Sequence, residues 1–296
     1  MNQHVIDALR DGRIFLQNHG VEDALDSSEQ LLSHVLLKTR STLYADGDKP
    51  LSGEKENFFY ELLAERSRRI PLQYLIGYVP FRYVDLKVRT GTFIPRPETE
   101  EVVDVAICRL EKQPAIKSQE SVRILEIGTG SGNLAISLAA EIPNARIIAT
   151  DCSSASLKLA RLNARKNSVH SRIEFIQTWL WEKVSGKFDL LVSNPPYLSE
   201  EDLKEISEEV RHEPICALDG GKDGLRVISG LISRAHEVLK PFGLIVLEIG
   251  YGQAGAVLQL LRKNGFEDIQ VNRDLAGIDR VVSAVLNSKG NTHEIP

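Results

Sequence analysis

The chain has 296 residues and a formal net charge of −5 at pH 7. This length allows two domains with sizeable hydrophobic cores. The weakly acidic balance excludes the global positive field that supports non-specific nucleic-acid binding, so we expect no stable nucleic-acid complex. No apolar run approaches the roughly 18 residues of a membrane-spanning helix, and we expect no membrane association. The first residues also lack the basic and apolar regions of a signal peptide.

The cysteines point to an intracellular protein. Cys108, Cys152 and Cys216 are widely spaced and odd in number. They match neither a disulfide framework nor the ligand spacing of a zinc site. The seven histidines do not cluster at metal-binding spacing either. We therefore expect three reduced thiols, no bound metal and a cytoplasmic location.

Helical spacing of apolar residues marks the beginning of the chain. Three segments with this spacing lie at 4–20, 26–38 and 52–69. The second opens on Asp26 and Ser27, residue types that favour helix N-caps. We expect a small helical bundle over residues 1–75.

The pattern changes after the third helix. Residues 76–95 alternate apolar side chains with Gly and Pro, which predicts a β-hairpin linker. Just before it, the charged run from Glu65 to Arg69 is typical of a solvated helix end, and contact with a partner is the alternative.

From residue 96 to 290, strand and helix patterns alternate. Strands are predicted at 122–128, 145–151, 173–177, 188–194, 244–250, 266–274 and 279–287. Alternation with helices gives right-handed crossovers and a parallel sheet covered on both faces. Because no helix separates the last two strands, we expect them to form an antiparallel hairpin at one edge. The prediction is an α/β domain with a doubly wound, seven-stranded, mostly parallel sheet.

A glycine-rich loop follows the first of these strands. In the sequence EIGTGSGN, Gly128, Gly130 and Gly132 allow the backbone to approach a ligand closely. A dinucleotide-binding fingerprint would place glycine at position 133, which is Asn133, so a pyrophosphate ligand is disfavoured. Asp151 ends the next strand, where a carboxylate accepts both hydroxyls of an unphosphorylated ribose. An adenosine attached to an amino acid fits this combination.

The sequence Asn194-Pro195-Pro196-Tyr197 ends the fourth strand at the same edge of the sheet. An amide or aminopurine nitrogen must pyramidalise before it attacks a methyl group, and two hydrogen-bond acceptors on its N–H groups favour that change. The side-chain carbonyl of Asn194 and the main-chain carbonyl of Pro195 are suited to this role, since proline fixes the backbone. Tyr197 is suited to stack on a planar substrate group.

These residues resemble the class I S-adenosylmethionine-dependent methyltransferases that methylate amino groups. More narrowly, the chain is similar, nearly end to end, to the peptide chain release factor N5-glutamine methyltransferases, the PrmC/HemK family. The motifs that carry this resemblance are FIPRPETE at 93–100, EIGTGSGN, SNPPY, HEPICALDGGKDGL at 212–225 and LEIGYGQ at 247–253.

The resemblance implies a reaction. A methyl group would pass from S-adenosyl-L-methionine to the side-chain nitrogen of the glutamine in the Gly-Gly-Gln motif of release factors, leaving S-adenosyl-L-homocysteine. The helical region would dock the release factor. Asn194 would contact both cofactor and substrate, and Asn194, Pro195, Pro196 and Tyr197 would bind the glutamine.

The resemblance also assigns the cofactor site. The residues from Gly128 to Gly132, including Thr129, Gly130 and Ser131, would contact the methionine end and the ribose edge, and Asp151 would hold the ribose. Phe93 and Thr99 would lie over the cofactor. Thr178 occupies a position where the family commonly has an acidic residue for the adenine amino group. Trp179 then packs either against adenine or in the core.

Three alternatives remain open at this point. The first is a sister enzyme that methylates a ribosomal-protein glutamine, and the second is an adenine-N6 or guanine-N2 methyltransferase of nucleic acids. The third is a protein that only senses the cofactor. Residues 199–213 hold seven acids and two basic residues, Lys204 and Arg211. This segment is interpreted as a solvated helix face that would repel phosphates.

Overall fold

In the computed structural model, which describes residues 3–117 and 119–287, the first unit of the chain is helical. Its helices are α1 (Val5–Asn18), α2 (Ala24–Leu36), α3 (Arg40–Ala45), α4 (Gly53–Ser67) and α5 (Leu72–Ile76). Leu16, Leu32 and Phe59 belong to its fully buried core. By its contacts this unit extends to Tyr78 and includes the distant segment Ser207–His212.

The predicted N-cap of the second helix is wrong. Helix α2 begins at Ala24, so Asp26 and Ser27 lie inside its first turn. Ser27 is fully buried, and its hydroxyl accepts a hydrogen bond from Nε of Arg66. Tertiary burial therefore overrides the local preference of these residues for a cap.

The predicted hairpin is confirmed. Strands β1 (Tyr78–Phe81) and β2 (Val84–Lys87) form a separate two-stranded sheet, which apart from Tyr78 belongs to the second unit. Leu86 is fully buried, while the alternate residues Asp85 and Lys87 are exposed.

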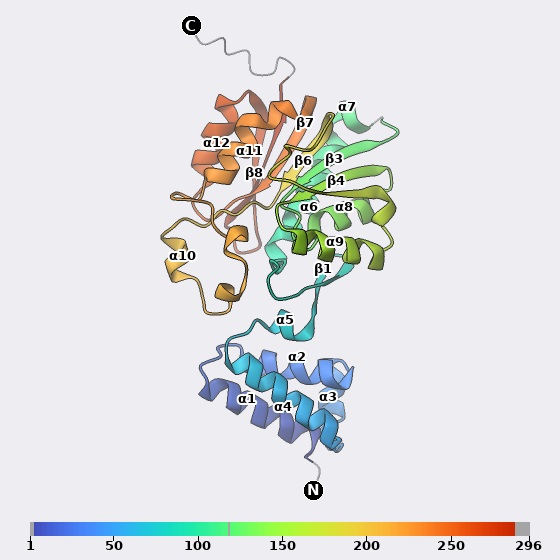
Figure 1. Cartoon of the computed structure of the whole chain (residues 1–296), viewed down its shortest axis with the longest axis vertical. Coiled ribbons are helices and arrows are strands. Elements are labelled where there is room, and N and C mark those ends of the chain that lie inside the picture. Colours follow the sequence, from blue (N-terminus) through green and yellow to red (C-terminus); the bar gives the residue numbers. More distant parts are fainter. Residues whose placement is uncertain (1–2, 118, 288–296) are drawn as a thin grey trace. The chain divides into compact units, whose positions relative to one another are not determined.

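The predicted doubly wound sheet is also confirmed (Figure 1). Its strands are β3 (Val122–Ile127), β4 (Ala145–Asp151), β5 (Ile173–Gln177), β6 (Phe188–Ser193), β7 (Leu239–Glu248), β8 (Phe266–Arg273) and β9 (Asp279–Leu286), in the order β5-β4-β3-β6-β7-β9-β8. The pairs up to β7 are parallel, and β9 pairs antiparallel with both β7 and β8. From β3, the strands β4 and β5 are added on one side of the sheet, and β6 and β7 on the other. Ligands bind in such folds at this change of strand order, between β3 and β6.

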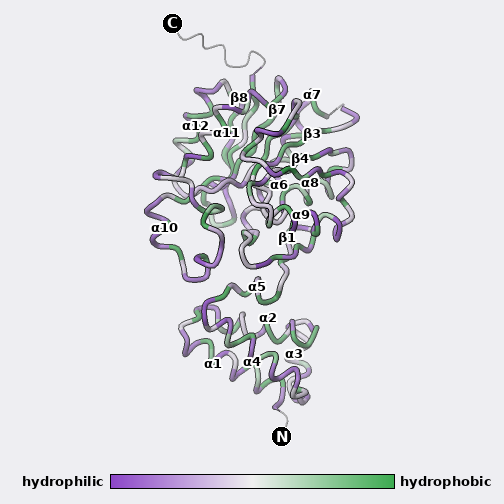
Figure 2. The backbone as a smooth tube through the Cα atoms, viewed as in Figure 1, coloured by the Kyte–Doolittle hydropathy of each residue, from purple (hydrophilic) through white to green (hydrophobic). Residues whose placement is uncertain are grey.

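Helices cover both faces of this sheet. On one face α6 (Glu100–Lys112), α8 (Asn133–Glu141) and α9 (Ser154–Lys166) share a core with Ile124. On the other, α11 (Arg226–Arg234) and α12 (Ala254–Lys263) share a core with Leu125. Neighbouring residues of a strand point to opposite faces of the sheet. Since helices cover both faces, the residues on both faces must be apolar. Figure 2 accordingly shows the sheet mostly in green, with purple along the loop around α10 (Asp202–Glu205).

The remaining helical segments are short: α7 (Pro114–Lys117) and the 3-10 turns Pro97–Thr99, His170–Arg172, Val210–His212, Ile215–Ala217 and Ala235–Glu237. Within residues 3–117 and 119–287, no helix combines the length and apolarity that a membrane crossing needs.

Candidate active site

The glycine loop joins β3 to α8 in a tight turn. The amides of Gly128 and Thr129 both donate to the carbonyl of Thr150, each at 2.9 Å. Gly132 has φ +91°, and a Cβ there would lie 2.8 Å from Cδ1 of Ile136 and 3.3 Å from Cβ of Ala160. The turn therefore requires glycine at this position, both for its backbone conformation and for helix packing.

Asp151 shapes this loop from the end of β4. Its carboxylate accepts hydrogen bonds from the amide of Gly130 at 2.9 Å and from the amide of Ser153 at 2.8 Å. Burial raises the pKa of Asp151, and the two amide hydrogen bonds oppose that rise. A carboxylate oxygen accepts more than one hydrogen bond, so both oxygens keep capacity for further donors.

Glu126, which precedes the loop on β3, was not predicted as a site residue. Its Oε2 accepts from the Thr129 hydroxyl at 2.6 Å and from the Ala135 amide at 3.2 Å. Its Oε1 is buried and has no hydrogen-bond partner among the described residues. Burial raises the pKa of Glu126 to about 8. The carboxyl group is therefore largely protonated at neutral pH, and the sequence suggests this only through its position at the strand end.

The pKa of Glu126 predicts a pH-dependent stability. Because the folded-state pKa of about 8 exceeds the reference value of 4.5, the folded chain retains a proton that the unfolded chain releases as the pH rises between these values. The contribution of Glu126 to the free energy of unfolding is fully present below pH 4.5 and is lost as the pH rises toward about 8. We expect the free energy of unfolding to fall by roughly 2 to 4 kcal/mol more in the wild type than in Glu126→Gln over this range.

Urea unfolding without ligand at a series of pH values measures this difference. Asp151 and Glu248 also have raised pKa values and contribute slopes of the same sign, but they are present in both proteins. Parallel pH profiles for wild type and variant would contradict the assignment to Glu126.

Strand β6 brings Asn194 beside the glycine loop. The Ser193 hydroxyl donates to the carbonyl of Ile127 at 2.7 Å and ties the ends of β6 and β3 together. The main-chain carbonyl oxygen of Asn194 lies 3.9 Å from the position that a Cβ on Gly128 would occupy. The predicted convergence of the Gly128 loop, Asp151 and Asn194 at one edge of the sheet is therefore present.

A buried polar network orients Asn194. Its Nδ2 donates to the hydroxyl of Thr99 at 3.0 Å. The carboxylate of Glu248, whose pKa the neighbouring Thr99 side chain lowers, accepts a hydrogen bond from the Tyr197 hydroxyl at 3.1 Å. A hydroxyl has two lone pairs, so Thr99 can accept from the Asn194 amide group while it lies beside Glu248. The Oδ1 of Asn194 is thereby left as the acceptor for a ligand.

Glu248 is the second site residue that sequence reasoning missed. It ends β7, it is buried, and its Oε2 has no partner within the described part of the chain. Burial raises its pKa, while the hydrogen bonds from Thr99 and Tyr197 lower it. Burial and the neighbouring Glu248 both raise the pKa of Tyr197. The phenol stays protonated and donates to Glu248, which holds the aromatic ring in place.

The glycine motif that follows the acidic segment supports the Asn-Pro-Pro-Tyr corner. A Cβ on Gly224, at φ +74°, would lie 2.2 Å from the Tyr197 carbonyl oxygen, so only glycine fits there. Nε2 of Gln253 donates to the same oxygen at 2.9 Å, and Oε1 of Gln253 accepts from the Gly250 amide at 2.8 Å. Gly224 from the motif at 212–225 thus allows the close approach of the Tyr197 backbone, and Gln253 from the motif at 247–253 fixes it by a hydrogen bond.

The segment 93–100 is fixed by a buried acid. Glu213 accepts from the Ile94 amide at 3.0 Å and pairs with the Arg96 guanidinium. That guanidinium lies 4.9 Å from the ring centroid of Phe93. Glu213 thus fixes the segment that carries Phe93 and Thr99, and Thr99 contacts Asn194 at the end of β6.

The two tryptophans have different environments. The amide of Thr178 donates to the Asp151 carbonyl at 3.1 Å, and Thr178 is buried. Trp179 is 51% exposed, so the core-packing alternative for Trp179 is wrong. Trp181 fills that place in the core and donates from Nε1 to Glu237. A role for Trp179 against adenine stays a prediction.

Comparison with known proteins adds three findings. The chain matches the family models described as PrmC N-terminal domain, over residues 7–77, and Methyltransferase small domain, over residues 110–218. It is 43% identical to the release factor glutamine methyltransferase of Synechocystis sp., over 73% of each chain. It is 38% identical to that of Geobacter sulfurreducens, over 91% of this chain and 92% of the relative. A methyltransferase from Pyrococcus furiosus shares the fold at 18% identity, with a TM-score of 0.51 over 76% of this chain and 99% of that one.

Proposed function

Since the chain belongs to the family of release factor glutamine methyltransferases, we propose that it methylates the side-chain nitrogen of a glutamine in peptide chain release factors. The methyl donor is S-adenosyl-L-methionine and the second product is S-adenosyl-L-homocysteine. The observation that carries this proposal is the hydrogen bond from Nδ2 of Asn194 to Thr99, which leaves Oδ1 as an acceptor on a residue whose backbone lies beside the glycine loop.

Unpartnered polar atoms fit a polar ligand at the loop. Within the described residues, Oε1 of Glu126 and Oγ of Ser131 are buried without hydrogen bonds. A buried polar atom without a hydrogen bond lowers the free energy of unfolding, unless a ligand or a water molecule supplies the missing partner. We assign the methionine end to the loop, the ribose to Asp151, and the remaining cofactor contacts to Phe93, Thr99, Trp179 and Asn194; the loop residues are Gly128, Thr129, Gly130, Ser131 and Gly132.

The bound cofactor supplies an electrophilic methyl group, and the chain's own residues prepare the nitrogen that receives it. Oδ1 of Asn194 and the carbonyl oxygen of Pro195 accept the two N–H hydrogens of the substrate amide, which favours a pyramidal nitrogen and holds its lone pair in line. Pro196 and Tyr197 pack against the glutamine. Preorganised acceptors aimed at developing positive charge lower the barrier. No strong base is needed, because the protonated N-methyl amide formed as the methyl–sulfur bond breaks is a strong acid and releases one N–H proton to water.

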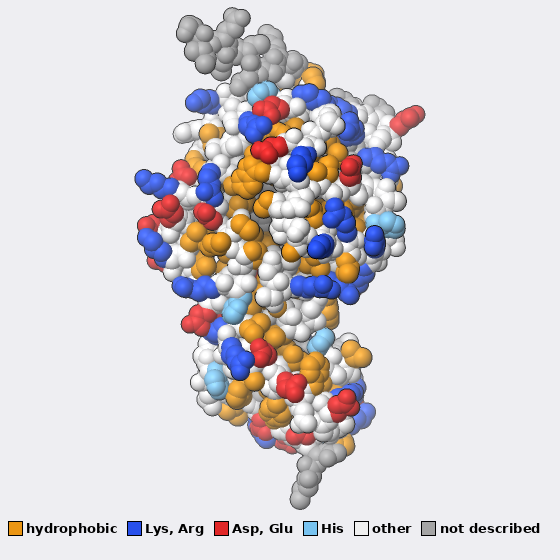
Figure 3. Space-filling view, viewed as in Figure 1, with side chains coloured by type: hydrophobic (Ala, Val, Ile, Leu, Met, Phe, Trp, Pro, Cys, Tyr) orange, Lys and Arg blue, Asp and Glu red, His pale blue; other side chains and the backbone are white. Residues whose placement is uncertain are grey.

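The helical unit is the proposed docking surface for the release factor. Residues 1–75 would bind the protein substrate, 76–95 would link the units, and 96–290 would carry out the transfer. Several hydrophobic side chains of this unit are exposed, among them Leu37, Tyr44 and Phe58, and Figure 3 shows hydrophobic side chains on the visible face of this unit. The exposed free thiols Cys108, Cys152 and Cys216 support a reducing, cytoplasmic setting.

The alternatives are less well supported. The formal charge of −5 gives no overall positive field that would favour a nucleic-acid substrate. The names of the relatives favour release factors over a ribosomal protein. A cofactor sensor would not need the oriented amide of Asn194.

Incubation of the pure protein with methyl-labelled cofactor and separate pools of release factor, ribosomal protein and DNA tests the proposal. We expect label in the release factor alone, at the glutamine of the Gly-Gly-Gln motif. A release factor in which alanine replaces that glutamine is the matched control and should stay unlabelled. Label in DNA or in ribosomal protein, with none in release factor, would show that the substrate assignment is wrong.

A further inference from the structure

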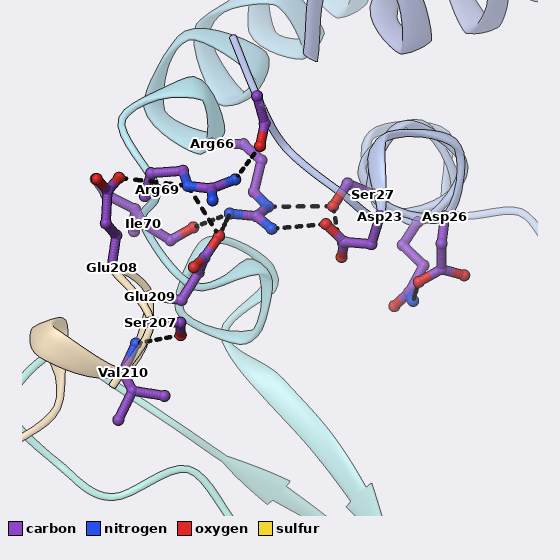
Figure 4. A network of polar contacts seen from close by, with 12 residues as sticks. Asp23, Asp26, Ser27, Arg66, Arg69, Ile70, Ser207, Glu208, Glu209 and Val210 are labelled. Atoms are coloured by element: carbon purple, nitrogen blue, oxygen red, sulfur yellow. Dashed lines mark hydrogen bonds and ion pairs between the residues drawn. The ribbon is translucent and has the colours of Figure 1, made fainter. Parts of the chain in front are cut away.

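Arg66 of the helical unit is an arginine with unusually complete polar contacts. Only 4% of its side chain is exposed. Its guanidinium donates to the Ser27 hydroxyl at 3.1 Å, to Asp23 at 2.8 Å and to Glu209 at 3.1 Å (Figure 4). The expectation that the end of this helix is solvated is therefore wrong for Arg66, because a buried guanidinium must be paired.

Arg69 adds a second set of contacts at the same place. Its Nε lies 3.3 Å from a carboxylate oxygen of Glu209 and 3.4 Å from one of Glu208, and Figure 4 shows both acids beside the two arginines. Its Nη1 donates to the Gly20 carbonyl at 2.6 Å. Glu209, 23% exposed, thus bridges Arg66 and Arg69, whereas Glu208 is 71% exposed and reaches only Arg69.

These acids belong to the segment that was interpreted as a solvated helix face. The helical part of that interpretation is wrong, because only Asp202–Glu205 forms an α-helix. Most charged side chains of the segment are exposed as expected, but Glu209 is only partly exposed and Glu213 is buried. By its contacts Ser207–His212 belongs to the helical unit. The chain on both sides, up to Ile206 and from Glu213, belongs to the methyltransferase unit. Charge pairing explains the difference, since Glu208 and Glu209 compensate arginines that the helical unit presents.

Both ends of the acidic segment lead to the candidate active site. Its N-terminal end continues from Tyr197, whose carbonyl Gln253 holds, and its C-terminal end is Glu213, which holds Ile94 and Arg96. The loop 198–213 is therefore fixed at the site at both ends and on the helical unit in its middle.

We propose that Glu209 is a positioning residue that couples docking of the protein substrate on the helical unit to the active site. By holding the middle of loop 198–213 on Arg66 and Arg69, it keeps this loop ordered while a protein loop bearing the glutamine enters. The proposal rests on the proposed function. The coupling through Glu209 acts only on a substrate large enough to contact the helical unit. A short peptide does not reach that unit, so its methylation should not depend on Glu209.

The test compares Glu209→Ala with the matched control Glu208→Ala on two substrates, an intact release factor and a short peptide containing Gly-Gly-Gln. With the release factor, we expect Glu209→Ala to raise KM about five- to tenfold at nearly unchanged kcat, as for a partly buried charged hydrogen bond. Glu208→Ala should change KM less than about twofold, as for an exposed pair. With the peptide, both variants should match the wild type.

Amide hydrogen exchange gives a readout that does not depend on the substrate. In Glu209→Ala, exchange over residues 198–213 should become faster, while the strands of the sheet keep their protection. Unchanged exchange, or an equal loss with peptide and release factor, would overturn the coupling role. If the wild type labels no release factor at all, the proposed function itself fails, which is a different outcome from a wild-type-like Glu209→Ala.

Discussion

Asn194→Ala is expected to lower turnover by about 100-fold or more while cofactor affinity stays within severalfold, by analogy with the loss of one preorganised polar group. The reason is that Oδ1 of Asn194 is oriented by the contact of its Nδ2 with Thr99, 3.0 Å away, and the alanine variant leaves the substrate nitrogen one acceptor short. Single-turnover methylation of release factor, together with calorimetric titration of the cofactor, measures the two quantities separately.

Thr99→Val is the matched companion of this variant. It keeps the shape of the side chain but removes the hydroxyl between Asn194 and Glu248. Without this hydroxyl, the Asn194 side-chain amide can rotate so that its nitrogen takes the place of its oxygen. We therefore expect an intermediate loss of about tenfold in the single-turnover rate. If Asn194→Ala methylates at a rate near that of the wild type, Asn194 has no part in the mechanism. If Thr99→Val does so, the contact with Thr99 does not orient Asn194.

Asp151→Ala is expected to weaken cofactor binding by about 10- to 100-fold, since hydrogen bonds to a charged group contribute roughly 1.5–3 kcal/mol. The variant removes the proposed ribose acceptor, and it also leaves the amides of Gly130 and Ser153 without the carboxylate that now accepts from them. Calorimetric titration measures the affinity, and thermal unfolding without ligand measures the second effect.

Asp151→Asn separates the two contributions. Asparagine keeps the volume and one acceptor oxygen, so the loop should lose less stability than in the alanine variant, while a ribose bound by both carboxylate oxygens would still be held less tightly. If both variants bind the cofactor as the wild type does, the ribose is held elsewhere and Asp151 only shapes the glycine loop.

Much of the fold follows from the sequence because its patterns are local. The alternation of apolar strands and helices predicts the doubly wound sheet, and the missing helix between β8 and β9 predicts the antiparallel edge. Gly128 and Asn194 directly follow strands β3 and β6, and Asp151 is the last residue of β4. Parallel strands carry their carboxyl ends to one edge, so these residues are predicted to meet there without knowledge of side-chain contacts.

The sequence by itself therefore determined the fold class and the meeting of Gly128, Asp151 and Asn194 at one edge of the sheet. Only the tertiary structure decided which polar groups are buried together: Thr99 with Asn194, 95 positions apart, and Arg66 with Glu209, 143 positions apart. It likewise decided that Glu126 and Glu248 are buried and have raised pKa values. The physical reason is that backbone preferences and hydrophobic periodicity act between near neighbours in the chain, whereas burial and charge pairing depend on which distant segments the fold brings into contact.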